Sequence, residues 1–233
     1  FIFIVVSLNT FPQWYWQNPL PQGNTLNSVK FTSSTTGWAV GAYGTILYTT
    51  DGGTTWTPQS SGTTSDLMDV CFIDANNGWA VGWGGTILKT TDAGTTWNPQ
   101  TSGISTYLLS LDFTDLNNGI AVGQEGSILR TTDGGANWTP QSSGTTDELT
   151  DVFLLDANTG TTVGFNGTIL KTTDGGANWS KDFYLTPGFT LYSMKFTDDN
   201  FGMIVGSSGY ILRTTNGGVN WDSVLSNTNK ELY

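Results

Sequence analysis

Histidine is absent from this sequence of 233 residues, and cysteine occurs once, as Cys71. Zinc sites are built mainly from His and Cys ligands, and many hydrolases pair a Ser or Cys nucleophile with His. The familiar zinc sites and the Ser-His-Asp and Cys-His catalytic arrangements are therefore excluded. One cysteine cannot form an internal disulfide. Because Cys71 lies in the apolar run from Leu67 to Ile73, we expect a buried, unreactive thiol.

Positive charge is also scarce, with 8 Lys and Arg against 19 Asp and Glu and a net charge of −11. Nucleic-acid binding requires clustered Lys and Arg side chains that neutralise phosphates. We therefore expect no nucleic-acid partner. No apolar run is long enough to span a membrane, so no membrane span is expected either.

The chain opens on a short apolar segment, Phe1–Val6, followed by Ser7–Gln13. This pattern is typical of the end of a secretory signal peptide, so residues 1–13 are predicted to be a signal-peptide remnant. The alternative is an extra strand packed on the domain. The favoured interpretation predicts a secreted, periplasmic or cell-surface protein.

Glycine, threonine and tryptophan are abundant, with 30 Gly and 10 Trp, whereas charged residues make up only 12%. β-Branched and aromatic residues favour strands, and Gly favours turns. No long stretch has helical periodicity. The composition therefore predicts an all-β protein.

One eight-residue stretch, Thr49–Trp56, returns four more times. Its lead positions are spaced by 41, 41, 41 and 42 residues, and they are Asp51, Asp92, Asp133, Asp174 and Asn216. A fixed period in this range indicates a repeat architecture.

Each repeat predicts four short strands, here called A to D in chain order. The A strands are expected at 26–31, 67–72, 108–113, 149–154 and 191–196, and the B strands at 38–41, 79–82, 120–123, 161–164 and 203–206. Strand C precedes the repeated stretch, and the Trp of that stretch begins strand D. Four strands per repeat of about 41 residues predict the blades of a β-propeller. The propeller domain is predicted at 14–233, with blades at about 26–66, 67–107, 108–148, 149–190 and 191–233.

A further D-like strand around Trp14–Gln17 precedes the first A strand. Because the last blade already has its own D strand, this leading strand has no place in a five-bladed ring. We therefore expect a fragment of a six- to eight-bladed ring with more blades after Tyr233. A closed five-bladed ring is the alternative.

The repeated stretch is interpreted as a structural turn. The Asp accepts hydrogen bonds from backbone N–H groups two or three residues later, and the Trp packs on the blade. Asn216 keeps the acceptor without the charge, which a catalytic acid or calcium site would not tolerate. Since the first Gly becomes Ala93, only the second Gly is expected to need a positive φ. The predicted turn residues are Asp51, Gly53, Trp56, Asp92, Gly94, Trp97, Asp133, Gly135, Trp138, Asp174, Gly176, Trp179, Asn216, Gly218 and Trp221.

The motif Thr-x-Asp-Gly-Gly-x-x-Trp resembles the Asp-box (BNR) repeat. Together with Gly37-Trp-Ala-Val-Gly41 and Gly85-Thr-Ile-Leu-Lys-Thr-Thr91, it resembles the photosystem II assembly/stability factor-like repeat family over about Trp14–Leu225. The resemblance implies a non-enzymatic β-propeller, usually of seven blades. It also implies, for photosynthetic members, a role in assembling a reaction-centre subunit. The opening Trp16–Gly23 is similar to secreted bacterial proteins that carry these repeats without any photosynthetic role.

Other candidate sites are weaker. Asp-box sialidases use three arginines, whereas this chain has only Arg130 and Arg213, which we interpret as repeated surface residues of strand C. The A strands carry Asp69, Asp112 and Asp151, which are interpreted as the polar lining of a wet channel, with a glycosidase carboxylate pair as the alternative. The motifs led by Asp74 and Asp156 resemble parts of calcium loops but lack further ligands, so they are interpreted as turn caps. No metal and no cofactor is expected.

The loops opposite the Asp-led turns differ among the repeats, although the framework does not. Variable loops on a rigid scaffold are where binding sites usually occur. The predicted binding residues are Tyr43, Trp83, Tyr107, Glu125, Phe165 and Tyr192. The sequence therefore predicts a secreted, non-enzymatic propeller that binds a protein or glycan through this face. The alternatives are a carbohydrate-active propeller and a photosystem II assembly factor in the strict sense.

Overall fold

The computed structural model describes residues 23–184 and 188–233. The predicted signal-peptide remnant and the predicted strand near Trp14 lie outside these ranges. The described chain folds into five four-stranded sheets, and in each sheet the strands pair in chain order. All the pairings are antiparallel, as in β1–β2, β2–β3 and β3–β4. No helix in these ranges is long and apolar enough to cross a membrane.

The strands have the following bounds. The first sheet consists of β1 (Leu26–Phe31), β2 (Gly37–Gly41), β3 (Thr45–Thr49) and β4 (Thr57–Gln59). The second consists of β5 (Leu67–Phe72), β6 (Gly78–Gly82), β7 (Ile87–Thr90) and β8 (Asn98–Gln100). The third consists of β9 (Leu108–Phe113), β10 (Gly119–Gly123), β11 (Ile128–Thr131) and β12 (Thr139–Gln141). The fourth consists of β13 (Leu149–Leu154), β14 (Gly160–Gly164), β15 (Thr168–Thr172) and β16 (Ser180–Tyr184). The fifth consists of β17 (Leu191–Phe196), β18 (Gly202–Gly206), β19 (Ile211–Thr214) and β20 (Asp222–Val224).

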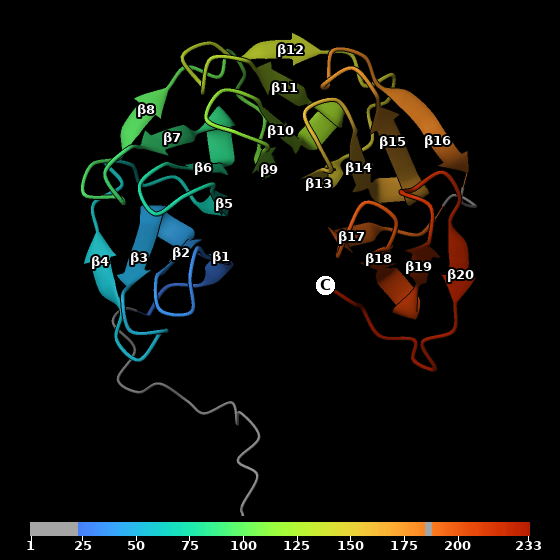
Figure 1. Cartoon of the computed structure of the whole chain (residues 1–233), viewed down its shortest axis with the longest axis horizontal. Helices are drawn as coiled ribbons and strands as arrows, with labels where there is room; N and C mark the ends of the chain where they lie inside the picture. Colours follow the sequence, from blue (N-terminus) through green and yellow to red (C-terminus); the bar gives the residue numbers. More distant parts are fainter. Residues whose placement is uncertain (1–22, 185–187) are drawn as a thin grey trace, which may run out of the picture.

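The five sheets are the blades of a propeller, arranged in an arc around one axis (Figure 1). The first strand of each sheet lies nearest the axis and the fourth lies at the periphery. The arc is open between the first and fifth sheets. The all-β propeller and the predicted A strands are therefore confirmed. Each D strand begins one residue after the Trp, at Thr57 in the first sheet, and not at the Trp itself.

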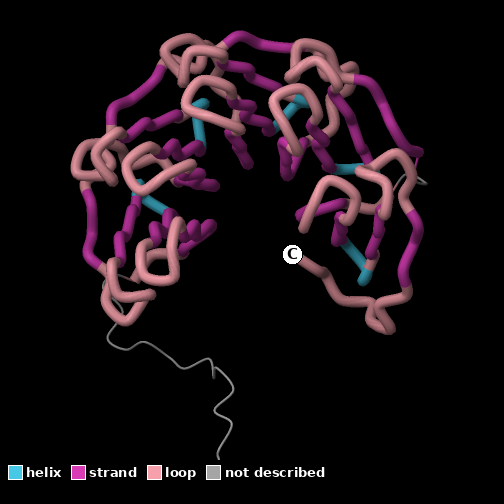
Figure 2. Tube along the Cα trace, in the orientation of Figure 1, coloured by secondary structure: helices cyan, strands magenta, loops and turns pink. Residues whose placement is uncertain are grey.

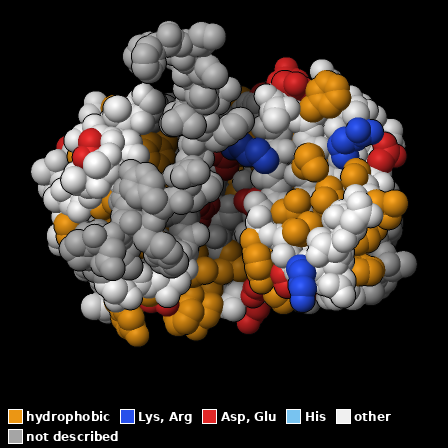
Figure 3. Space-filling view, turned by 90° about the horizontal axis from the view of Figure 1, so that it is seen from below, with side chains coloured by type: hydrophobic (Ala, Val, Ile, Leu, Met, Phe, Trp, Pro, Cys, Tyr) orange, Lys and Arg blue, Asp and Glu red, His pale blue; other side chains and the backbone are white. Residues whose placement is uncertain are grey.

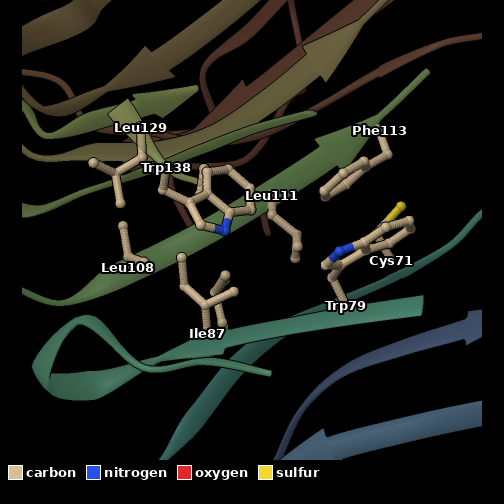
Figure 4. Close-up of a cluster of buried hydrophobic side chains, with 10 residues drawn as sticks. Cys71, Trp79, Ile87, Leu108, Leu111, Phe113, Leu129 and Trp138 are labelled. Carbon is tan, nitrogen blue, oxygen red and sulfur yellow. The ribbon is translucent and has the colours of Figure 1, made fainter. Parts of the chain in front are cut away.

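The hydrophobic core lies between neighbouring sheets. In Figure 4, Trp79 and Cys71 of the second sheet face Phe113 and Leu111 of the third. The Trp79 and Phe113 rings stack with centroids 3.7 Å apart, and Trp79 is 0% exposed. Burying such an aromatic side chain contributes several kcal/mol, so each sheet depends on its neighbour for stability. Cys71 is buried as predicted, and burial raises the pKa of its thiol to about 12.

Each sheet has two ends with different connections. One end carries a short 3-10 turn between the second and third strands and the linker that enters the first strand. The 3-10 turns are η1 (Ala42–Gly44), η2 (Trp83–Gly85), η3 (Gln124–Gly126), η4 (Phe165–Gly167) and η5 (Ser207–Gly209). We call this end of the propeller the loop face, and the opposite end, which carries the Asp-led turns, the turn face. Figure 2 shows the loops at the sheet ends.

The second strand of every sheet ends in a glycine because the backbone of the residue that precedes the first strand lies very close to this position. A Cβ atom on Gly123 would lie 1.9 Å from the carbonyl oxygen of Tyr107. The next residue, Gln124, donates its backbone N–H to that same carbonyl at 2.9 Å. The linker residue before each first strand is thereby fixed beside the 3-10 turn of its own sheet.

Candidate functional site

The Asp-led turn is held by hydrogen bonds within itself. In the first repeat, Thr49 Oγ1 accepts from the backbone N–H of Gly53 at 3.0 Å and donates to Asp51 Oδ1 at 2.8 Å. Asp51 Oδ1 accepts from the backbone N–H of Thr55, and Oδ2 accepts from the Thr55 hydroxyl. These bonds from Thr55 hold the pKa of Asp51 below its usual value. Both carboxylate oxygens are thus occupied by the turn, which supports its structural role.

Two details of the predicted turn were wrong. The Asp accepts from a backbone N–H four residues later, not two or three. Both glycine positions have a positive φ, with 72° at Gly52 and 86° at Gly53, and Ala93 adopts 60°. Alanine at the first position therefore tolerates a left-handed conformation, with some strain. Asn216 accepts from Asn220 N and Thr214 Oγ1, so the amide replaces the carboxylate as expected.

Replacing buried Thr90 by valine is expected to cost about 1–3 kcal/mol of unfolding free energy, because the buried N–H of Gly94 loses its acceptor. Chemical denaturation of the purified chain measures the change. Thr91→Val, at the neighbouring exposed position, is the matched control and should change the stability by less than about 0.5 kcal/mol. Equal effects of the two substitutions would contradict the assigned role of Thr90.

The cationic residues of the third strands connect one sheet to the next. Lys89 Nζ donates to the Gly134 carbonyl at 2.8 Å, and Arg130 Nε donates to the Gly175 carbonyl at 2.7 Å. Lys171 Nζ reaches Gly217 in the same way, at 3.2 Å. The prediction that Arg130 is a repeated surface residue was therefore incomplete. The Arg130 side chain binds the Asp-led turn of the following sheet, which explains why a long cationic side chain recurs at this position of the third strand.

The aspartates of the inner strands accept hydrogen bonds that link neighbouring sheets around the axis. Asp69 Oδ1 accepts from Ser28 Oγ at 2.7 Å, and Asp69 Oδ2 accepts from Leu111 N at 3.0 Å. Ser110 Oγ donates to Asp151 Oδ1 at 2.9 Å, and Met194 N donates to Asp151 Oδ2 at 2.7 Å. Serine and aspartate thus alternate from sheet to sheet.

Burial raises the pKa of these carboxyl groups, to about 7 for Asp151. Asp112 is similar: burial raises its pKa, and Oδ2 accepts from Leu154 N at 2.8 Å. A raised pKa alone would suit a general acid. However, the oxygens of all three carboxyl groups accept hydrogen bonds from the protein itself. The arrangement therefore resembles a structural connection between sheets. It resembles less a pair of glycosidase carboxylates or the polar lining of a water-filled channel.

The calcium-like motifs are turn caps. Asp74 Oδ1 accepts from the backbone N–H groups of Asn76 and Asn77, both at 2.7 Å. Asp156 accepts from Asn158 and Thr159 in the same way. Within the two described ranges, no group of three or more acidic or cysteine side chains is placed to hold a metal ion.

The loop face presents different side chains on a repeated backbone. The middle residue of each 3-10 turn has a positive φ, and the non-glycine residues there are Tyr43, Glu125, Asn166 and Ser208. Positive φ is costly for residues other than glycine, and such strain occurs often at functional sites. Each of these side chains stands at the tip of a turn held by the rigid sheet below.

The predicted residues Trp83 and Tyr107 lie together, although Trp83 is on the 3-10 turn of the second sheet and Tyr107 immediately precedes the first strand of the third. Their rings stack with centroids 4.7 Å apart and an interplanar angle of 4°. Trp83 remains 42% exposed, so the stack offers a flat apolar surface to solvent at the junction of the second and third sheets. The pairing was not predicted. The signal for it was that Tyr107 ends the linker that connects the second sheet to the third.

The other predicted residues are distributed around the same face. Tyr43 is 72% exposed at the tip of η1, and Phe165 is 40% exposed on η4. Glu125, at the tip of η3, lines an open groove of about 770 Å³ together with Ile104, Pro140 and Asp147. Tyr192 differs, because it lies on β17 and stacks on Tyr233 at 4.7 Å. A hydrogen bond to Glu231 raises the pKa of Tyr192. The Tyr192 side chain is therefore already in contact with residues near the end of the same chain.

The loop face is acidic near the aromatic stack. Acidic residues stand in or next to the linkers and turns of the second, third and fourth sheets, and they are Asp66, Glu125, Asp147 and Glu148. Hydrogen bonds from Asn166, Thr168 and Thr145 hold the pKa of Asp147 below its usual value, so it is ionised near neutral pH. Neither Lys nor Arg lines the groove beside Glu125. The exposed stack and this groove form the candidate binding site.

Comparison with known families identifies relatives over most of the chain. The family model described as photosynthesis system II assembly factor YCF48 matches residues 58–140 and 138–231. The BNR/Asp-box repeat model matches residues 47–58. No curated protein matches the sequence.

Several solved structures share the fold. The structure described as YCF48 bound to D1 peptide is 20% identical with a TM-score of 0.50, and the match covers 88% of this chain and 82% of that one. YCF48 from Cyanidioschyzon merolae is 19% identical with a TM-score of 0.50, covering 91% of this chain and 88% of that one. The GH74 enzyme of Niastella koreensis is 17% identical with a TM-score of 0.73, covering 89% of this chain and 38% of that one. At these identities the likeness shows the propeller fold.

Proposed function

Because this chain belongs to the family of photosynthesis system II assembly factor YCF48, we propose that it is a non-enzymatic propeller scaffold that binds a polypeptide partner on its loop face. The observation that carries the proposal is the exposed stack of Trp83 on Tyr107, beside the groove lined by Glu125. Aromatic side chains at a rigid, partly exposed position are typical anchors of protein interfaces.

The chemistry of the site indicates the kind of segment that fits. The stack offers a flat apolar surface, and the groove next to it carries the carboxylates of Glu125 and Asp147. Complementary charge favours association and orients the partner. The partner segment would therefore combine an apolar side chain with a Lys or Arg a few residues away.

The carbohydrate-active alternative has less support. The candidate acid–base groups, Asp69, Asp112 and Asp151, all accept hydrogen bonds from neighbouring inner strands. A glycosidase needs one carboxyl group free to protonate the leaving oxygen and a second free to attack or to activate water. The likeness to GH74 enzymes concerns the fold. The secreted location is likewise a proposal that depends on Phe1–Val6, which lie outside the described residues.

The proposal is tested by selecting 12-residue peptides on the purified chain from a random phage-displayed library. Selected peptides should be enriched in basic and apolar residues. A Trp83→Ala/Tyr107→Ala double substitution should weaken their binding at least tenfold, because the stacking surface is lost, as measured by isothermal titration calorimetry. Leu116→Ala removes a residue that is 49% exposed on the turn face, and this control should leave the affinity unchanged.

Two further probes separate the alternatives. Xyloglucan should be neither bound nor cleaved, and cleavage that is lost in Asp112→Asn or Asp151→Asn would replace this proposal with the carbohydrate-active one. A D1 peptide tests the strict photosystem role, since the related structure is described as binding one. Selection of peptides whose affinity is unaffected by the double substitution would overturn the assignment of the stack.

A further inference from the structure

Two grooves on the loop face are built from the same sequence. In the third sheet, residues 140–146 line the groove beside Glu125. In the first sheet, residues 59–64 line a groove of about 580 Å³ beside Tyr43. Residues 57–64 and 139–146 are identical, both reading Thr-Pro-Gln-Ser-Ser-Gly-Thr-Thr, and 59–64 and 141–146 have the same order of buried and exposed positions. The linkers that form the two grooves are therefore equivalent.

The linker and the 3-10 turn lie equally close to each other in the two sheets. A Cβ atom on Gly44 would lie 2.1 Å from the carbonyl oxygen of Thr63 in the first sheet. A Cβ atom on Gly126 would lie 2.2 Å from the carbonyl oxygen of Thr145 in the third. The backbone of the two grooves is thus alike, and the residue at the tip of the 3-10 turn distinguishes them.

The tip of the 3-10 turn has a backbone conformation that favours glycine. The φ angle is 55° at Tyr43 and 56° at Glu125, and the second sheet has Gly84 at this position, with 65°. Because Gly84 forms the same turn, the fold does not require a side chain there. Tyr43 and Glu125 are therefore present despite their conformational strain, which is typical of residues that serve binding.

The exposure of Tyr43 does not depend on the opening of the arc. Figure 3 looks into that opening, between the first and fifth sheets. Tyr43 lies at the junction of the first sheet with the second, since its backbone N–H donates to Asp66 Oδ1 at 2.8 Å and Asp66 directly precedes β5. Tyr43 is 72% exposed at this inner junction.

The two grooves differ in chemistry. None of the described residues that line the groove beside Tyr43 is charged, whereas Glu125 and Asp147 both line the groove of the third sheet. The ring of Tyr43 can pack against another aromatic ring, and the carboxylate of Glu125 can pair with Lys or Arg. The second sheet, which carries Trp83, lies between the first and third sheets along the arc (Figure 1).

We propose that Tyr43 and Glu125 determine the specificity of one extended track over the first three sheets. The track binds a partner segment that carries an aromatic side chain at the first sheet and a Lys or Arg at the third. This inference rests on the proposed function and adds a second anchor to it. Packed sheets lie about 10 Å apart, so grooves two sheets apart are separated by at least about 20 Å. An extended residue spans about 3.3 Å, so at least about six residues separate the aromatic and the basic side chain.

Peptides of 12 residues selected on the purified chain from a random phage-displayed library test the track, because they extend to about 40 Å. Selected peptides should carry an aromatic residue and a Lys or Arg at this separation. Tyr43→Gly and Glu125→Gly should each weaken the binding of a selected peptide at least tenfold, as measured by isothermal titration calorimetry. Ser208→Gly is the matched control, because Ser208 has the same φ of 55° at the tip of η5, and it should leave the affinity unchanged.

A second pair of measurements separates contact with the peptide from a structural role. Replacing the aromatic residue of the selected peptide by alanine should weaken binding to the wild-type chain at least tenfold. The same peptide change should have no further effect on Tyr43→Gly, because the two groups contact each other. The melting temperature of Tyr43→Gly should be unchanged or higher, as for Ser208→Gly, since glycine relieves the strain at the tip.

The outcomes distinguish this inference from the proposed function. Unchanged affinity in Tyr43→Gly, together with loss of binding in Trp83→Ala/Tyr107→Ala, would overturn the track and leave the proposed function in place. A lower melting temperature for Tyr43→Gly than for Ser208→Gly would assign Tyr43 a structural role and would also overturn the track. Failure of the library to yield any binding peptide would overturn both.

Discussion

Replacing Trp79 by alanine is expected to lower the free energy of unfolding by about 3–5 kcal/mol. Trp79 is 0% exposed and stacks on Phe113 across the junction between the second and third sheets. Its indole N–H also donates to the Gly134 carbonyl at 3.1 Å. The substitution therefore removes a large buried ring and one hydrogen bond between the sheets. Equilibrium denaturation of the purified chain measures the loss.

Met203→Ala is the matched control, since Met203 occupies the same slot in the fifth sheet but is 45% exposed. This substitution should change the free energy of unfolding by about 0.5 kcal/mol or less. Equal losses for the two substitutions would show that the slot stabilises its own sheet and not the junction with the next one.

Replacing Asp151 by asparagine is expected to change how stability depends on pH. Burial raises the pKa of Asp151 to about 7, and the nearby Asp69 carboxylate raises it further, while bonds from Met194 N and the Ser110 hydroxyl oppose the shift. An asparagine side chain can accept from Met194 N and donate to the Ser110 hydroxyl. The variant thus keeps the hydrogen bonds between the sheets and removes the group that titrates.

A carboxyl group with a folded pKa above its unfolded value stabilises the fold in its protonated form. This stabilisation is complete below the unfolded value of 3.8 and is lost as the pH rises toward 7. Relative to Asp151→Asn, the wild-type chain should lose up to about 1.4 kcal/mol per pH unit across that window. A difference between wild type and Asp151→Asn that does not vary with pH would contradict the buried environment assigned to Asp151.

Most of the fold could be predicted because the same sequence pattern occurs in each of the five repeats. The five A strands begin and end at the predicted residues, since an apolar first position and a following turn recur in each repeat. The structural role of the Asp-led turn followed from Asn216 and Ala93. These residues show that the turn tolerates loss of the Asp charge and replacement of the first Gly. The positive φ at the first glycine was missed because Ala93 accepts a conformation that alanine usually avoids.

The contacts between repeats could not be predicted, because they join residues about 41–55 positions apart whose relative placement depends on the curvature of the arc. The Arg130 bond to Gly175 and the Ser110 bond to Asp151 are of this kind. The candidate site was predicted in part. The loop face and its aromatic residues came from the variation among repeats, whereas the stacking of Trp83 on Tyr107 and the occupation of Tyr192 by Tyr233 required the structure.

We propose that the loop face binds the partner and that the turn face only holds the sheets together. Hydrogen–deuterium exchange of the chain with a selected 12-residue peptide tests this division of roles most directly. Slower exchange is predicted at Trp83–Gly85, at 104–107 and at Gln124–Gly126, with no change in the Asp-led turns. Protection in the Asp-led turns, for example at Thr49–Trp56, without protection at the stack of Trp83 on Tyr107 would show that the partner binds the turn face and not the loop face.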